Sequence, residues 1–166
     1  MLVFDATPLI YLAKAAELER LDALETEKVI PEAVYAEVVT TGKEKEVADA
    51  FVVEKCVETG VFSVEAARRG DVFAMLRGNR RLSEADVAVL AMAKQRGGTA
   101  ILDDDYARSI AAVEGIDNRG TIFLIVRLLR RGTMTPGEAK KTVDTMIDCG
   151  WYCSIDLYKE IVNTIL

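Results

Sequence analysis

Carboxylates follow two of the apolar segments that we predict to be buried strands. Asp5 comes directly after residues 1–4, and the run Asp103, Asp104 and Asp105 comes directly after residues 99–102. In an open parallel sheet, binding sites form outside the carboxyl ends of the strands. These two segments therefore bring several negative charges to one edge of the sheet. Asp5 has little structural use at a strand end, whereas one or two of the later aspartates could cap the next helix.

Two further carboxylates lie on predicted helices. Glu37 follows Val34 by three residues and precedes Val38, which places it on the apolar side of its helix. Asp86 lies near a helix N-terminus, at the edge of an apolar stripe. Each has a structural alternative, because Glu37 would be solvated if the helix phase differed slightly and Asp86 could form a capping box with Ser83. Carboxylates that converge repel one another, and a hard divalent cation relieves that repulsion.

Histidine is absent from the 166 residues, which excludes histidine-based triads, histidine-ligated zinc and a histidine general base. All-oxygen ligation suits Mg²⁺ or Mn²⁺, and such a site can deprotonate water and stabilise the leaving oxygen of a phosphodiester. The three cysteines, Cys56, Cys149 and Cys153, are too few for a disulfide framework, and we expect buried reduced thiols. The net charge of −6 argues against a surface that binds polyanions everywhere.

Short apolar segments alternate with amphipathic helices, which indicates an α/β domain whose parallel sheet is covered on both faces. Thr7 and Pro8 predict the start of the first helix, with a hydroxyl cap followed by proline. The predicted strands are 1–4, 28–30, 60–64 and 99–102, with a short fifth strand or a loop around 116–118. The later predicted helices are 31–42, 43–57, 65–81 (helical and then a loop), 83–96, one from about 106, 121–131, 136–149 and 155–166.

Four segments carry these acids in a recognisable order. They are residues 2–9 with Asp5, residues 31–38 with Glu37, residues 82–91 with Asp86, and residues 101–108 with the aspartate run. In this order they resemble the motifs of the PIN-domain ribonucleases, including the VapC-type toxins of toxin–antitoxin systems. The resemblance spans roughly residues 1–120, and four ordered motifs are more specific than any one alone.

The resemblance implies a three-layer α/β/α sandwich with a central parallel sheet of about five strands. Residues 1–166 would form one PIN-like domain, with a motif-bearing core in 1–120 and C-terminal helices in 121–166. It also implies an endoribonuclease that depends on Mg²⁺ or Mn²⁺, and possible membership of a toxin–antitoxin pair.

The resemblance also assigns roles to individual residues. Asp5, Asp86 and one of the three aspartates would bind the metal, and Glu37 would act through metal-bound water. Among Asp103, Asp104 and Asp105 the alignment leaves the choice open, and Asp104 is given the most weight as the fourth catalytic acid. Thr7 would orient Asp5, and Ser83 would support Asp86.

Arginines flank two of these motifs. Arg77, Arg80 and Arg81 lead into the helix of Asp86, and Arg108 follows the aspartates, so all four are candidates for phosphate contacts with RNA. A solvated arginine loop is an equal alternative, and Arg108 could instead pair with an aspartate. The sequence shows no obvious aromatic platform on which bases could stack.

The partners follow from the same hypothesis. We expect an RNA substrate, a cytoplasmic location without leader or membrane span, and an antitoxin if the chain is a toxin. The apolar stripes of 121–131 and 155–166 could form a homodimer interface or could complete the core. The alternative function is a non-catalytic PIN-like module that binds RNA or a protein. A phospho-acceptor domain is a third hypothesis.

Overall fold

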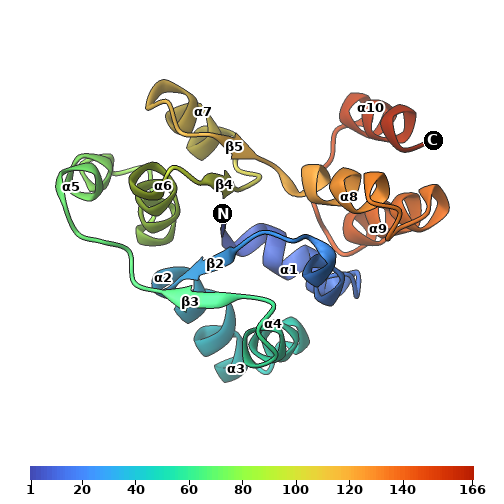
Figure 1. Ribbon diagram of the computed structural model, residues 1–166, viewed down its shortest axis with the longest axis horizontal. Helices are drawn as coiled ribbons and strands as arrows, with labels where there is room; N and C mark the ends of the chain where they lie inside the picture. The colour runs from blue at the N-terminus through green and yellow to red at the C-terminus, as the bar shows by residue number, and fades with distance from the viewer.

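The computed structural model describes residues 1–166 and contains one sheet of five strands. The order across the sheet is β3-β2-β1-β4-β5, and every neighbouring pair is parallel. The five predicted strands are thus present (Figure 1). Their bounds are β1 (Leu2–Phe4), β2 (Lys28–Pro31), β3 (Ser63–Glu65), β4 (Thr99–Ile101) and β5 (Asn118–Arg119).

The strand order reverses beside β1. From β1 the chain adds β2 and β3 on one side, and it then crosses over to add β4 and β5 on the other side. Strands β1 and β4 are hydrogen-bonded neighbours, with Phe4 opposite Ile101. The connections that leave these two strands diverge at their carboxyl ends, which is where open α/β sheets form ligand sites.

Helices cover both faces of the sheet, as the three-layer α/β/α expectation requires. Figure 1 shows α5 and α6 on one side of the sheet, and α1, α8 and α9 on the other. None of the helices has the length and apolar character that crossing a membrane requires. Their bounds are α1 (Ala6–Lys14), η1 (Glu19–Ala23), α2 (Glu32–Tyr35), η2 (Ala36–Thr40), α3 (Thr41–Glu44), α4 (Ala48–Glu58), α5 (Asp71–Arg77), α6 (Glu84–Arg96), α7 (Asp105–Val113), α8 (Thr121–Arg130), α9 (Pro136–Asp148) and α10 (Ile155–Ile165).

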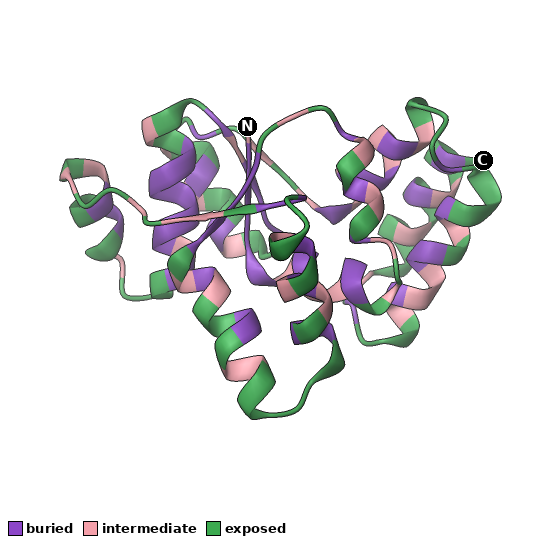
Figure 2. Cartoon of the chain, turned by 60° about the horizontal axis from the view of Figure 1, so that its bottom comes forward, coloured by how far each residue is buried: buried purple, intermediate pink, exposed green.

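Helix α6 lies at the centre of the core. Residues 87–93 are buried without interruption, because α6 packs against β1, β2 and β4 on one side and against α2 and α5 on the other. Figure 2 shows that the buried residues gather on the strands and on the inner sides of the helices. A helix that is apolar all round is held firmly, so the polar residues at its N-terminus, Ser83 and Asp86, have fixed positions.

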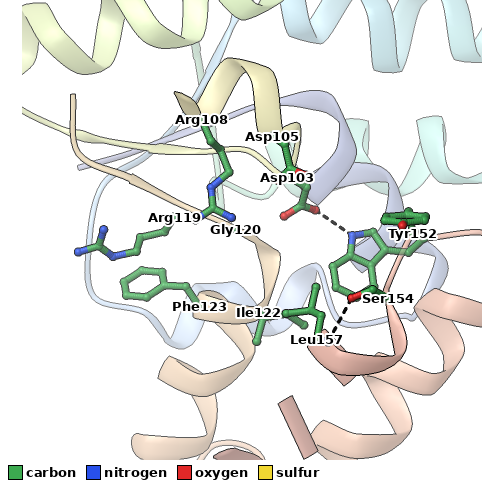
Figure 3. A pocket seen from close by; sticks show the side chains of 11 residues that line it. Asp103, Asp105, Arg108, Arg119, Gly120, Ile122, Phe123, Tyr152, Ser154 and Leu157 are labelled. Atoms are coloured by element: carbon green, nitrogen blue, oxygen red, sulfur yellow. Dashed lines mark hydrogen bonds between the residues drawn. The ribbon is translucent and has the colours of Figure 1, made fainter. Parts of the chain in front are cut away.

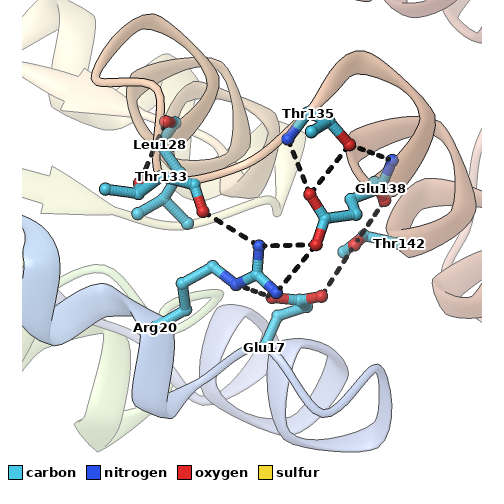
Figure 4. Close-up of polar contacts among 7 residues, drawn as sticks. All are labelled: Glu17, Arg20, Leu128, Thr133, Thr135, Glu138 and Thr142. Atoms are coloured by element: carbon cyan, nitrogen blue, oxygen red, sulfur yellow. Dashed lines mark hydrogen bonds and ion pairs between the residues drawn. The ribbon is translucent and has the colours of Figure 1, made fainter.

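The C-terminal helices are tied to the beginning of the chain by a polar network centred on Arg20 (Figure 4). Its guanidinium donates to the carbonyl of Thr133 at 3.0 Å and to Oε1 of Glu138 at 3.2 Å, and it pairs with Oε2 of Glu17 at 2.8 Å. The backbone N–H and hydroxyl of Thr135, and then Arg20, lower the pKa of Glu138 to about 2. Burial raises the pKa of Glu17, and Arg20 opposes that effect. These contacts fix the loop that leads into α9.

Some helix bounds differ from the predicted ones. Helix α1 begins at Ala6, so Asp5 rather than Thr7 occupies the N-cap position. The helix predicted to end at Gly42 continues to Glu44, and the chain breaks instead near Glu46, which adopts a φ of 56°. The region predicted as helical from Glu65 contains the end of β3 and then α5.

The cysteines only partly follow the expectation of buried thiols. All three are free, and Cys56 is buried in α4, where burial raises its pKa to about 11. Cys149 is exposed at the end of α9, and Cys153 is half-buried in the segment before α10. The expectation fails for these two because they lie in a connection between helices at the surface.

Candidate active site

Asp5 lies at the switch point of the sheet. It follows β1 directly, and its backbone N–H donates to the carbonyl of Ile101 at 2.9 Å, which continues the pairing with β4 by one residue. Its backbone is extended, with φ −84° and ψ 171°, at the N-cap position of α1. The side chain makes no cap hydrogen bond, and the residue is only 8% exposed. The fold therefore buries a carboxylate at the place where a ligand site is expected.

Other carboxylates lie within electrostatic range of Asp5. Burial is the main cause that raises its pKa to about 7, and a hydrogen bond from the backbone N–H of Ala6 opposes the rise. The negative charges of Asp86, Glu37 and Asp103 raise it further, in that order. The acids of all four sequence motifs thus lie close enough to Asp5 for their charges to act on it.

Asp103 is the member of the aspartate run whose charge raises the pKa of Asp5. Its Oδ1 accepts from the backbone N–H of Thr121 at 2.7 Å, while its Oδ2 accepts from the Thr121 hydroxyl at 2.7 Å and from the indole N–H of Trp151 at 3.0 Å. A Cβ at Gly120 would lie 2.9 Å from Oδ1, so only glycine leaves room for the carboxylate. The start of α8 and the segment after α9 together hold Asp103 in place.

The other two aspartates have different positions. Asp104, which the resemblance weighted most, is the N-cap of α7, and its Oδ2 accepts from the backbone N–H of Ala107 at 2.7 Å. Asp105 is the first residue of α7 and is exposed. The capping interpretation thus applies to Asp104, and Asp103 is the better candidate for the fourth acid.

Asp86 both caps its helix with Ser83 and lies within electrostatic range of Asp5, so both interpretations of the sequence apply to it. It forms a reciprocal capping box, in which the Ser83 hydroxyl accepts from the backbone N–H of Asp86 at 3.0 Å and Oδ2 of Asp86 accepts from the backbone N–H of Ser83 at 2.7 Å. Its Oδ1 makes no hydrogen bond within the protein, and its charge reaches Asp5. One oxygen therefore stabilises the helix and the other is available to a ligand.

Glu37 and Thr7 complete the group of candidates. Glu37 is exposed and lies in a π-helical stretch, residues 36–40, that joins α2 to α3. Single π turns shift the direction of the side chains that follow, and they are frequent at functional sites. Thr7 is half-buried and lines a cavity with Tyr11 and the three aspartates.

Two adjoining cavities open beside the aspartates. One has a volume of about 400 Å³ and contains Thr7 and Tyr11; the other, of about 490 Å³, contains Arg108 and Arg119 (Figure 3). They share four lining residues: Asp103, Asp105, Trp151 and Tyr152. The sequence analysis missed Trp151, Tyr152, Arg119 and Thr121, because only the folded chain brings them to the aspartate run.

The arginine loop lies against the start of α7. The guanidinium of Arg81 stacks on the ring of Tyr106 with its centre 3.6 Å from the ring centroid, and the Asn79 amide donates to the Tyr106 hydroxyl at 2.9 Å. Arg77 and Arg80 are exposed and make no ion pair. The loop is therefore held next to the aspartate run through Tyr106, and it carries two unpaired cations.

The donor set fits a hard divalent cation in its chemistry. The residues around Asp5 offer carboxylate oxygens. Burial is the main cause of the raised pKa of Asp5, and the neighbouring negative charges add to it, a repulsion that a cation would relieve. In the described conformation, no three His, Cys, Asp or Glu residues are close enough together to hold one metal ion. The oxygen ligands that a divalent cation needs are thus present, but in this conformation the side chains do not converge on one position.

Comparison with known proteins agrees with the fold. A family model described as a PIN domain matches residues 1–165. A search of curated proteins finds no match. PIN domains are generally nucleases and typically use divalent metal ions. With its parallel sheet of five strands and a match over almost its whole length, this chain belongs to the PIN-domain family.

Proposed function

We propose that this protein is a metal-dependent endoribonuclease that hydrolyses phosphodiester bonds in RNA. The observation that carries the proposal is the burial of Asp5 at the switch point, next to three other carboxylates that raise its pKa. A fold with no ligand to bind would gain stability by removing such a charge, because burying a carboxylate among like charges is unfavourable.

Each acid has a role in this proposal. Asp5, Asp86 and Asp103 would hold Mg²⁺ or Mn²⁺, which neutralises charge on the phosphate and makes water more acidic. Asp103 is held in position by Thr121 and Trp151. Glu37 is exposed and close enough to act on Asp5, so it is the candidate to accept the proton of the attacking water.

The cations near the aspartates would hold the RNA backbone. Arg81 stacks on Tyr106 at the start of α7, and Arg108 belongs to the same helix. Arg77 ends α5, and Arg80 lies in the connection between α5 and α6. Guanidinium groups contact phosphates independently of sequence, and this local positive charge offsets the net charge of −6. The toxin role, the antitoxin partner, the homodimer and the cytoplasmic location stay predictions from the resemblance.

The test is cleavage of labelled RNAs by the purified protein with Mg²⁺ or Mn²⁺ and with a chelator. We expect cleavage that the chelator abolishes and that falls by at least about a hundredfold in Asp5→Asn, Asp86→Asn and Asp103→Asn. Asp104→Asn keeps a good helix cap and should retain activity. The matched control is Asp156→Asn, whose side chain is 95% exposed. Cleavage that survives both Asp5→Asn and Asp86→Asn would overturn the proposal.

A second candidate function is a non-catalytic module that binds RNA or a protein partner. The observation that favours it is the absence of any three acids close enough to hold one metal ion. Binding of RNA without metal dependence, together with no cleavage of diverse RNAs, would favour this function over the nuclease.

A further inference from the structure

We infer that the cavity between β5, α8 and the segment before α10 binds one unpaired nucleotide of single-stranded RNA, with its base on Tyr152 and its phosphate at Arg108. This inference rests on the proposed nuclease function, because it assigns the substrate contact next to the acidic site. The cavity has a volume of about 490 Å³, which is within the range of sites that bind small molecules.

The segment after α9 supplies one wall of this cavity. Gly150 has a φ of 103°, a conformation that favours glycine, and it turns the chain after α9. The next two side chains differ in how far they are buried. Trp151 is 6% exposed and donates its indole N–H to Asp103, whereas Tyr152 is 84% exposed. The bond to Asp103 thus places an unusually exposed aromatic ring beside the acidic site.

The opposite wall carries positive charge. Figure 3 shows Arg119 and Phe123 across the cavity from Tyr152, with Arg108 near Asp103. The side chain of Arg108 makes no ion pair, and its only hydrogen bond runs from Nε to Oδ1 of Asn118 at 3.2 Å. Its terminal nitrogens are therefore free to donate to a phosphate. Arg119 is partly neutralised, since it pairs with Asp117 at 2.9 Å.

The combination of a ring and a guanidinium selects the class of ligand. An exposed tyrosine can stack on any base whose face is free, and in a duplex that face is already covered by neighbouring bases. Arg108 would bind the phosphate of the same nucleotide. This cavity shares Asp103 and Asp105 with the cavity that contains Thr7, so a nucleotide bound here would lie next to the aspartate run.

The test is fluorescence anisotropy of a short labelled single-stranded RNA with the full chain, in a chelator so that no cleavage interferes. We expect Tyr152→Ala to weaken binding about tenfold or more and Tyr152→Phe to bind like the wild type. Arg108→Ala should weaken binding and reduce the dependence of log K on log salt by about 0.7 for the lost phosphate contact. Phe51→Ala removes a half-exposed ring of α4 and should have no effect.

A duplex RNA separates stacking from charge. Its binding should respond to Arg108→Ala and not to Tyr152→Ala. Equal weakening of single strand and duplex by Tyr152→Ala would overturn the stacking role, and wild-type affinity in both variants would overturn the site as a whole. A different result would overturn only the proposed nuclease function. In that result, RNA binding depends on Tyr152 as expected, but no divalent metal ion produces cleavage.

Discussion

Neutralising Asp5 should make the protein more stable above pH 7 while it disables the site. In the folded protein the pKa of Asp5 is raised from 3.8 to about 7, mainly by burial and then by the surrounding carboxylates. Between these two values the folded state holds a proton that the unfolded state releases, so stability falls as the pH rises through this window. The loss is complete above pH 7.

The size of the effect follows from the shift. A difference of about three pKa units corresponds to about 4 kcal/mol at 1.36 kcal/mol per unit. The variant Asp5→Asn removes the charge and keeps an acceptor for the N–H of Ala6. We therefore expect it to gain up to about 4 kcal/mol at pH 8 without metal, which corresponds to a rise in Tm of about 10 °C for a chain of this length.

The assay is thermal and urea unfolding of wild type and Asp5→Asn at pH 8 and near pH 4, with a chelator present. The gain should be large at pH 8 and should shrink to less than about 1 kcal/mol near pH 4, where Asp5 is protonated in the folded state and about half protonated in the unfolded state. Asp156→Asn, fully exposed, should change neither value by more than a few tenths of a kcal/mol. An Asp5→Asn protein that is no more stable than wild type at pH 8 would refute the view that Asp5 is held at a cost to stability.

Three further predictions concern the residues that hold the site. Trp151→Phe removes the indole hydrogen bond to Asp103, and we expect the rate of RNA cleavage to fall about tenfold while the Tm changes little. Gly120→Ala places a Cβ within 2.9 Å of the Asp103 carboxylate, so cleavage should fall more than in Gly137→Ala, where the added Cβ meets nothing. Arg20→Ala leaves Glu17 without its ion pair, and urea unfolding should show a loss of about 2 kcal/mol.

The sequence predicted the strands and the positions of the acids because both are local patterns. A buried parallel strand is a short apolar run, and the residue that follows it is at the carboxyl edge of the sheet wherever the strand lies. The position of Asp5 at this edge could therefore be predicted before the fold was known, and its catalytic role stays a prediction. The position of Asp86 near a helix N-terminus could also be predicted from the sequence. Its capping box with Ser83 is compatible with a place within electrostatic range of Asp5.

The choice within the aspartate run could not be made from sequence. Asp103, Asp104 and Asp105 lie in one strand-to-helix turn, where each residue points in a different direction. Thr121 and Trp151 hold the Asp103 carboxylate, and those partners are 18 and 48 residues away along the chain. The aromatic wall at Tyr152 was missed for the same reason, since no local pattern places the end of α9 beside β4.

The central claim is that the carboxylates around Asp5 bind a divalent cation, and titration with Mn²⁺ monitored by electron paramagnetic resonance tests it directly. Loss of the free Mn²⁺ signal measures binding without any RNA. We predict saturable binding by the wild type and by Asp156→Asn, and its loss in both Asp5→Asn and Asp86→Asn. Binding of Mn²⁺ that is the same in wild type and in Asp5→Asn would contradict the account.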